Sequence, residues 1–585
     1  MPDADEAELV AEVRADYEAR AEKRRETEAG WRLNMRFVSG DQYCYRSGES
    51  VFDIEPEYPW QERQTFNHIA SIVETRLAKL SRVRPVMSVR PASGDNDDVK
   101  AARTSGKILD SASVRLDLPG LLSRGTMWSE ICGTAFYKLV WDGDAADGAG
   151  DVYAEVCPPF EIYPESLSAE DVTDLKSVIH ARAVHVDDIL AAYGKSVPPE
   201  PPETLLSLAD APVGCATVIE RYTCPDAQHP DGELAVVAGG ELLYRGPLPD
   251  GLPFVRQVSI ARPGRFFGTS MVERTIPIQR AYNAVKNRKH EFMNRLAGGV
   301  IAVEDGSVDT ESLEAEGLCP GRIVVYRQGA TPPRIMDSGR VPGDFSAEED
   351  RLLNEFVSVS GVSEIMRAST VPSSLSSGTA LQLLIEQDDT RLSVTAENIN
   401  ACAREMAKRI LMLYKRYAVK PRLARIVGTD GDIELLRFTS ADITSDDVVC
   451  DSGSEISATP ASRQNMLFEL LRSGLLYDEN GRLDATTRYK ILSVLGYGGW
   501  EQLKDEETLH YNRAERENAA AAAGGTPSVS EIDDHDAHVA VHTRYLLGAE
   551  RQNNPDPALE ERLLAHIRAH RNFKAVEAEA NHEKA

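Results

Sequence analysis

The stretch 379-TALQLLIEQDDTRLSVTAENINACAREMAKRILMLYKRYAVK-420 contains no glycine or proline. Its apolar side chains recur at seven-residue spacing in two series, Ile385, Leu392, Ile399, Met406 and Leu413, and Ala396, Ala403, Ile410 and Tyr417. At 1.5 Å per residue this pattern predicts a helix about 60 Å long. The seam alternates with alanine and Cys402 and lacks ordered flanking charge pairs, so we favour a long buried helix crossing a large subunit over a two-stranded coiled coil.

The segment before this helix has an unusual order of elements. A basic helix begins near Ile276 in 266-FFGTSMVERTIPIQRAYNAVKNRKHEFMNRL-296. From Arg274 to Arg295 the sequence contains six lysines and arginines and a single acid, Glu291. Three short β segments follow, GGVIAVEDG, GRIVVYRQG and PPRIMDSG, and then a second helix at 347–359. The Ser- and Gly-rich stretch GVSEIMRASTVPSSLSSG predicts a loop between that helix and the long one.

The flanking regions mix helices and strands. Helical spacing predicts helices at 4–38, 67–80 and much of 95–132. Alternating patterns predict strands in PVMSVRP, FEIYPES, SVIHARAVH, VIERYTC and ELAVVAG, and a hairpin in AFYKLVWDGDAADGAGDVYAEVCP. The C-terminal third adds a strand pair in DIELLRFTS and DVVCDSG, and an AAAAAGGTPS hinge before two further helical segments. The chain is therefore predicted to be α+β.

Composition narrows the function classes. With 585 residues, several domains or one long multi-layered subunit are expected. A formal charge of -28 and a pI near 4.9 argue against nucleic-acid binding over the whole surface. No apolar run could span a bilayer and the acidic N-terminus does not resemble a signal peptide, so a soluble, unexported chain is expected. The eight cysteines are scattered and read as thiols in a reducing compartment.

The common catalytic motifs are missing. The nearest match to a phosphate-binding loop, 101-AARTSGKILD, has Ala101 in place of the first glycine and Ile108 in place of the Ser/Thr that would bind magnesium. No Gly-x-Ser-x-Gly, His-Glu-x-x-His or Gly-x-Gly-x-x-Gly pattern occurs. The acidic turn at 142–151 lacks the closing glutamate of a calcium loop, so a solvated turn is favoured. We therefore expect no enzymatic activity and no cofactor.

Histidines near the C-terminus are the best candidates for a metal site. In 533-DDHDAHVAVH-542 the spacing places His535, His538 and His542 near one helix face, and His566 and His570 repeat the pattern four residues apart. A transition-metal site is one interpretation. The favoured one is a polar helix start capped by aspartates, because a cluster on a single helix commonly lacks a closing ligand.

Several segments in this order resemble the portal proteins of tailed bacteriophages, in particular the larger podovirus-type group. The resemblance is carried by 34-NMRFVSGDQY-43, 65-TFNHI-69 followed by Arg84-Pro85, 267-FGTS-270, 278-IQRAYN-283, 378-GTALQLLIEQDDTRLS-393 and 534-DHDAHVAVH-542. Each piece is weakly specific, and their order carries the assignment. The chain is short for the group, so a long helical barrel after the crown is not expected.

The resemblance implies a portal fold with a mixed α/β wing, a helical stem, a small β-rich clip, a long crossing helix and a helical crown. The implied divisions are an N-terminal helical arm 1–38, the wing 39–275, a stem helix 276–298, the clip 299–342, a second stem helix 343–360, a tunnel loop 361–378, the crossing helix with return strands of the wing 379–455, and the C-terminal crown 456–585.

The same resemblance implies a ring, typically of twelve subunits, at one capsid vertex of the virion. Such a ring conducts double-stranded DNA during packaging and ejection. Its implied partners are the terminase large subunit, a tail adaptor, and the major capsid and scaffolding proteins, with no membrane. Assembly would take place in the bacterial host cytoplasm.

The candidates for lining the DNA channel are basic residues of the implied stem and basic or polar residues of the tunnel loop. They are Arg280, Lys286, Arg288 and Lys289 in the stem and Arg367, Ser373 and Ser374 in the loop. A passage for DNA needs weak, distributed phosphate contacts. The equally weighted alternative is that the stem cations pair with acids of the adjacent helix. Two rival functions remain, a soluble metal-dependent enzyme using the His535, His538 and His542 cluster, and another structural or scaffolding protein of a virion.

Overall fold

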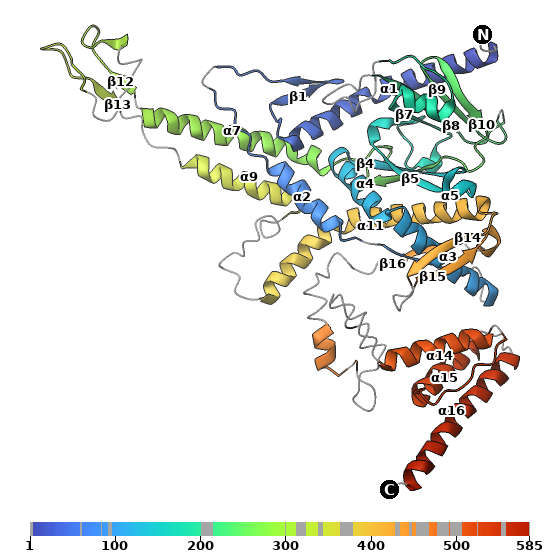
Figure 1. The fold of residues 1–585 in the computed structure, drawn as a ribbon. Helices are drawn as coiled ribbons and strands as arrows, with labels where there is room; N and C mark the ends of the chain where they lie inside the picture. Colours follow the sequence, from blue (N-terminus) through green and yellow to red (C-terminus); the bar gives the residue numbers. More distant parts are fainter. Residues whose placement is uncertain are drawn as a thin grey trace.

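The computed structural model describes residues 4–58, 61–83, 85–91, 96–200, 214–227, 229–298, 300–311, 323–336, 343–362, 378–427, 433–443, 447–451, 467–474, 476, 491, 506–522, 524–550 and 557–583. Figure 1 shows an α+β body and two helices, α7 and α9, that lead from it toward a small β-hairpin. Three helices at the C-terminal end, α14 to α16, form a separate bundle. The predicted fold class is confirmed.

The larger sheet of the body is antiparallel, with strand order β10-β9-β8-β7-β6. Its strands are β6 (Ile162–Pro164), β7 (Ser177–His185), β8 (Cys215–Thr223), β9 (Glu233–Ala238) and β10 (Glu241–Gly246), and α6 (Val186–Tyr193) follows β7. The predicted N-terminal helix is α1 (Ala4–Ser39), which ends where Gly40 adopts a φ of 97°. Val13 and Tyr17 of α1 pack with Ile179 and Val237 of the sheet.

A second sheet has the order β11-β4-β5. Its strands are β4 (Thr134–Asp142), β5 (Asp151–Cys157) and β11 (Phe254–Val258). β4 and β5 form the predicted hairpin, with Asp142 opposite Asp151 and the one-turn helix α5 (Ala145–Gly148) between them. The helices α3 (Asn96–Arg115) and α4 (Leu118–Cys132) come directly before β4 and contribute to the same buried core.

The long helix is α11 (Gly378–Tyr417), and its 40 residues confirm the predicted length. Leu392, Ile399, Met406 and Leu413 of the first apolar series are at most 1% exposed. Ile399, Met406 and Leu413 pack with α3, α4 and the three-stranded sheet in one core cluster, so this part of the seam is buried inside the chain. The preference for a buried crossing helix over a coiled coil is therefore confirmed for the described part of this seam.

Two short antiparallel pairs complete the body. β14 (Arg422–Val427) pairs with β15 (Ile433–Phe438), and β16 (Val448–Asp451) pairs with β3 (Val86–Val89). The prediction that DIELLRFTS and DVVCDSG form one strand pair is wrong. The strand that directly follows α11 is the nearest partner for β15, and β16 instead completes a pair with a strand from the N-terminal region.

The two long helices beyond the body are α7 (Met271–Gly298) and α9 (Asp344–Ser360). α7 begins before the predicted Ile276 because the Ser270 hydroxyl accepts a hydrogen bond from the Glu273 amide at 3.0 Å and caps the first turn. α9 ends at Gly361, whose φ is 69°. Between them lie β12 (Val300–Ala302) and β13 (Arg334–Met336), which pair antiparallel.

The segment GRIVVYRQG does not form the strand that its composition predicts: residues 323–327 are irregular. Ile323 is 86% exposed and Val325 80% exposed, so these two side chains pack on no sheet face among the described residues. Intrinsic β propensity alone does not make a strand without packing partners.

Further elements come from the N-terminal and C-terminal regions of the chain. The body also contains the hairpin β1 (Cys44–Ser47) and β2 (Ser50–Asp53), and the helix α2 (His68–Leu80), which Asn67 caps. The C-terminal bundle consists of α14 (Glu506–Ala522), α15 (His535–Glu550) and α16 (Pro557–Glu583). The last two lie after the AAAAAGGTPS hinge, and they confirm the two helical segments predicted there. Within the described ranges, none of the helices combines the length and the apolarity needed to cross a membrane.

Candidate functional site

One face of α7 is held to the body by amide side chains spaced four residues apart. The Gln279 side-chain oxygen accepts from the His68 backbone amide at 3.0 Å, and the Asn283 oxygen accepts from Phe66 at 3.1 Å. Asn287 continues the series by accepting from the Gln64 amide at 3.1 Å. The sequence segments 65-TFNHI-69 and 278-IQRAYN-283 are therefore adjacent in space, which the sequence alone did not indicate. This ladder fixes the rotation of α7 about its axis.

The basic side chains of α7 lie on other faces. Lys289 is 3.0 Å from a Glu349 oxygen of α9, and Lys286 lies 3.7 Å from the other oxygen of the same carboxylate. Arg280 donates to the Cys44 carbonyl at 2.7 Å and lies over the Phe37 ring. Lys286 and Lys289 are thus paired with an acid of the adjacent helix, whereas Arg280 contacts a backbone carbonyl and an aromatic ring of the body.

Arg288 is different from its neighbours. Its side chain is exposed, and no ion pair links it to another residue in the described ranges. Of the candidates on α7, it is the one with a charge still available to an outside group. The other channel candidates, Arg367, Ser373 and Ser374, lie outside the described residues, as does most of the predicted tunnel loop 361–378.

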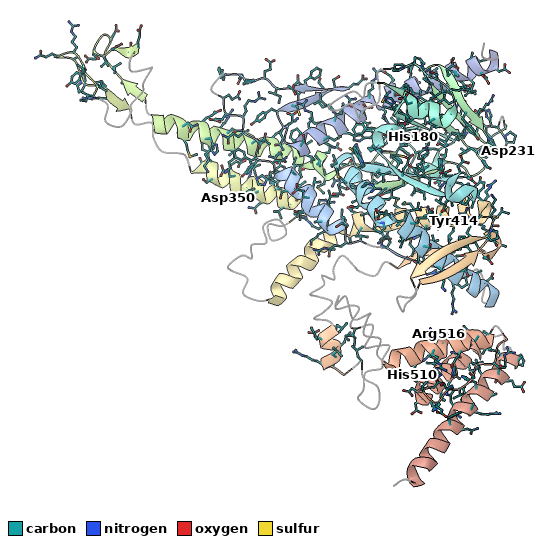
Figure 2. The ribbon with its side chains drawn as sticks, in the orientation of Figure 1. His180, Asp231, Asp350, Tyr414, His510 and Arg516 are labelled. Carbon is teal, nitrogen blue, oxygen red and sulfur yellow. The ribbon has the colours of Figure 1, made fainter. Side chains whose placement is uncertain are left out.

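A buried ionic network lies between the two sheets of the body. Lys138 of β4 is 2.6 Å from Glu220 of β8, and His180 of β7 contacts Glu220 at 3.1 Å and Glu161 at 3.2 Å. Sheet register places His180 directly opposite Glu220 and Lys138 opposite Glu155. The contact between Lys138 and Glu220 then joins the two sheets. Figure 2 places His180 inside the body. In the sequence, Lys138 and His180 each stand between two apolar residues of a predicted strand, and Glu220 follows two apolar residues of another.

The pKa values of this network follow from its pairing. Burial alone would raise the pKa of Glu220, but the Lys138 ammonium and the His180 hydrogen bond hold that pKa well below its usual range. Burial opposes protonation of His180, yet the adjacent Cys157 and the hydrogen bonds to Glu161 and Glu220 raise its pKa well above its usual range. The arrangement is a closed set of opposite charges with a structural role.

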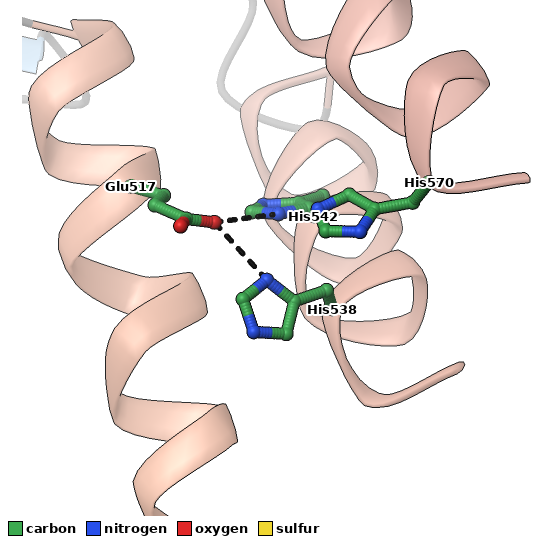
Figure 3. A group of neighbouring side chains, drawn as sticks. All are labelled: Glu517, His538, His542 and His570. Carbon is green, nitrogen blue, oxygen red and sulfur yellow. Dashed lines mark hydrogen bonds and ion pairs between the residues drawn. The ribbon is translucent and has the colours of Figure 1, made fainter. Parts of the chain in front are cut away.

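The C-terminal histidines form a second buried cluster, in the three-helix bundle. His538 and His542 of α15 are fully buried, as is His570 of α16, and the three converge on the Glu517 carboxylate of α14 (Figure 3). His538 Nδ1 lies 3.0 Å and His542 Nε2 3.5 Å from the same oxygen, Glu517 Oε2. The structure therefore brings two of the predicted histidines to a common point with groups from two other helices.

The other two histidines flank this group. His535 Nδ1 is 2.9 Å from His570 Nδ1, and His566 Nε2 lies 3.2 Å from both Glu517 Oε2 and His570 Nε2. Burial and the four neighbouring histidines lower the pKa of His570 to about 4, so its imidazole is neutral near pH 7. The cap interpretation is also partly realised, because the Asp534 carboxylate accepts from the Ala537 amide at 3.1 Å.

The comparisons with known proteins agree with the order of these elements. A family model described as Phage P22-like portal protein matches residues 227–462. That segment holds α7, the β12–β13 hairpin, α9 and α11. No curated protein matches the chain. The match supports a phage portal protein, a structural family, and does not extend to the podovirus-type grouping.

Proposed function

We propose that this chain is the portal protein of a tailed phage, and that its copies form a closed ring, typically of twelve subunits, at one vertex of the capsid. The ring would be the channel for packaging and ejecting double-stranded DNA. The observation that carries the proposal is the portal-family match to the segment 227–462.

In this proposal each part of the fold has a place in the ring. The body corresponds to the wing, α7 and α9 to the stem, and the β12–β13 hairpin to the clip. The bundle α14 to α16 corresponds to the crown, and 361–378 to the tunnel loop. The clip would receive the terminase large subunit during packaging and the tail adaptor afterwards.

Exposed apolar side chains near the hairpin support association between copies. Ile323 and Val325 are more than three quarters exposed, and Tyr326 is 45% exposed. Apolar residues gathered at the far end of a projecting arm are typical of surfaces that another protein covers. In a ring, a neighbouring copy would provide that cover.

The distribution of charge suits a passage for DNA. Tight neutralisation of phosphates would hold DNA in place, whereas a chain of net charge -28 with isolated cations gives weak contacts. In α7 two lysines are already paired with Glu349, and Arg288 is an exposed candidate for phosphate that forms no ion pair among the described residues. Ring symmetry would repeat it once per subunit.

The first experiment is negative-stain imaging of the purified chain with light-scattering mass at two concentrations. Rings with a central hole and a mass near twelve times 64.3 kDa are expected. A compact dimer at both concentrations, unchanged in the presence of scaffolding protein, would contradict the proposal. A scaffolding protein would form no closed ring, so the image also separates that rival.

A second experiment tests the channel. Arg288→Glu should leave the ring intact and reduce the amount of DNA packaged per particle. The control Arg265→Glu, in the loop after β11, should leave both the ring and the amount of packaged DNA unchanged. Deleting residues 373–377 should also leave assembly intact and impair DNA retention. Loss of the ring in that deletion would contradict the tunnel-loop assignment, and equal packaging in both arginine variants would remove Arg288 from the channel.

A further inference from the structure

The three-helix bundle at the C-terminus has little aliphatic core. In the described part of the bundle, the buried apolar side chains are mostly small: Ala514, Ala521, Ala537, Val541, Leu563 and Ile567. The rest of the buried interior is polar and consists mainly of histidine: Asn518, Asp533, His535, His538, His542, His566 and His570. Small units of this kind commonly depend on an additional stabilising element such as a metal ion.

Three of the buried histidines and the half-buried Glu517 are arranged as a ligand set. Glu517, His538, His542 and His570 each offer one ligand atom, and these atoms lie within 4.8 Å of one another. In a tetrahedral zinc site with bonds of about 2.0–2.1 Å, neighbouring ligand atoms are about 3.3 Å apart. The distances of 3.0 and 3.5 Å from Glu517 Oε2 to His538 Nδ1 and His542 Nε2 lie on either side of that value.

The hydrogen bonds around His542 leave one of its ring nitrogens available to bind a cation. Its Nδ1 lies 2.7 Å from the Asn518 side-chain oxygen and donates its proton there. In the neutral ring Nε2 then carries a lone pair, directed at the Glu517 carboxylate. That Nε2 is buried and has no hydrogen-bond partner among the described residues. Two lone pairs facing each other in a buried site repel, and a metal ion between them would bind both.

Neighbouring side chains orient the ligands as they do around known metal sites. The Arg513 guanidinium donates to Glu517 Oε1 at 3.2 Å, which leaves Oε2 for the metal. His570 Nδ1 is engaged by His535, so Nε2, which lies 3.2 Å from His566 Nε2, is the nitrogen of His570 that would bind the metal. Such outer partners fix the tautomer and direction of ligating imidazoles.

We propose that Glu517, His538, His542 and His570 bind one Zn²⁺ ion in each chain. Three imidazole nitrogens and one carboxylate oxygen form a donor set that suits zinc, and they come from α14, α15 and α16. Four protein ligands complete a tetrahedral shell and leave no position for water or substrate. The ion is therefore structural: it joins the three helices, and its binding energy contributes to their folding. The site stands independently of the portal assignment.

The test uses the full-length chain after treatment with a chelator and return to metal-free buffer. Added ZnCl₂ should bind at one equivalent per chain and remain after gel filtration, as measured by elemental analysis. Co²⁺ in place of zinc should give the intense visible absorption of a tetrahedral site. No retained zinc, or the weak spectrum of octahedral Co²⁺, would overturn the proposal.

Variants locate the site. His538→Ala and His542→Ala should each weaken zinc binding at least tenfold, and the pair should abolish retention. Glu517→Gln keeps the size of the side chain and removes its charge, so it tests the ligand role with least disturbance, and far-ultraviolet circular dichroism verifies that the helices remain. His185→Ala, at an exposed position of the body, is the matched control and should retain full binding.

Another group in the body, Glu155, Cys157 and His180, also has ligand-type side chains within reach of one another. Cys157→Ser should therefore keep one zinc per chain. Loss of zinc in Cys157→Ser, or equal zinc binding in His185→Ala and in the double variant of His538 and His542, would overturn the assignment to the bundle.

Discussion

The body and the C-terminal bundle each bury a cluster of ionisable side chains, but the two clusters are composed differently. In the body, the cations Lys138, Arg182 and protonated His180 meet the carboxylates of Glu155, Glu161 and Glu220. In the bundle, five histidines surround the single carboxylate of Glu517, and ring nitrogens of His538 and His542 have no hydrogen-bond partner in the described ranges. The body cluster therefore pairs cations with carboxylates, whereas the bundle cluster gathers ligand-type nitrogens around one carboxylate.

The difference teaches how one chain can tolerate buried charge in two ways. Burying an ion costs several kcal/mol unless a partner is present. β-sheet register provides partners at defined positions, since directly opposite residues face each other. In the bundle, the Arg513 guanidinium contacts one oxygen of Glu517, and ring nitrogens of His538, His542 and His566 lie near the other oxygen. That second oxygen is where we propose the metal ion binds.

Lys138→Met tests the body cluster and should have the largest effect. It leaves Glu220 buried without its ammonium partner, which should lower the free energy of unfolding of the body by about 3–5 kcal/mol. Urea unfolding followed by tryptophan fluorescence measures this, because Trp31, Trp128 and Trp141 lie in the body and α14 to α16 contain no tryptophan. A change below about 1 kcal/mol would show that the pair contributes little.

Acid should weaken the same cluster, by less than the substitution. The pKa of Glu220 is held well below 4.5 in the folded chain, so its stabilising contribution is present above pH 4.5 and is lost as the pH falls through the folded value. The pKa of His180 is raised well above 6.5, so its contribution is complete below pH 6.5 and is lost as the pH rises through its folded value. The fluorescence melting temperature should therefore fall on both sides of the window from pH 4.5 to 6.5. In Glu220→Gln the decline on the acid side should be smaller, and an unchanged decline would assign it to other carboxylates.

Asn518→Leu tests how the bundle cluster orients His542 for zinc binding. It removes the acceptor that fixes the His542 tautomer but no ligand, and loss of such an outer partner typically weakens metal binding by about 10- to 100-fold. Zinc affinity measured by calorimetry tests this. Asn518→Asp retains an acceptor for Nδ1 and should bind zinc close to the unaltered chain; if both variants bind equally well, the hydrogen bond does not orient His542.

Arg182→Gln should have the smallest effect. Its side chain is 39% exposed at the rim of the body cluster, where the ion pair with Glu155 is screened by solvent. A loss of at most about 1 kcal/mol in unfolding free energy is expected. A loss comparable to that of Lys138→Met would mean that the rim belongs to the buried network.

Local patterns were enough to predict much of the fold. The apolar heptad series gives α11, and inward-facing Val and Ile residues at alternate positions give β7, β8 and β9, because these periodicities depend on neighbours in the chain. The paired interpretation of the α7 lysines also depends on a long-range contact, and only the structure identified Glu349 as their partner. Strand pairing was not predictable in the same way: β16 pairs with β3 from the N-terminal region.

The histidine cluster shows most clearly what the sequence by itself determined. It placed His535, His538 and His542 on one helix, because helical geometry relates residues three, four and seven positions apart. It could not provide the closing ligands, because Glu517 and His570 belong to other helices and reach the site only through packing. Periodicity is a property of a single segment, whereas a coordination shell depends on how separate segments meet. The tertiary structure alone therefore decided that three helices converge on one point, and that a set of histidines is also a candidate zinc site.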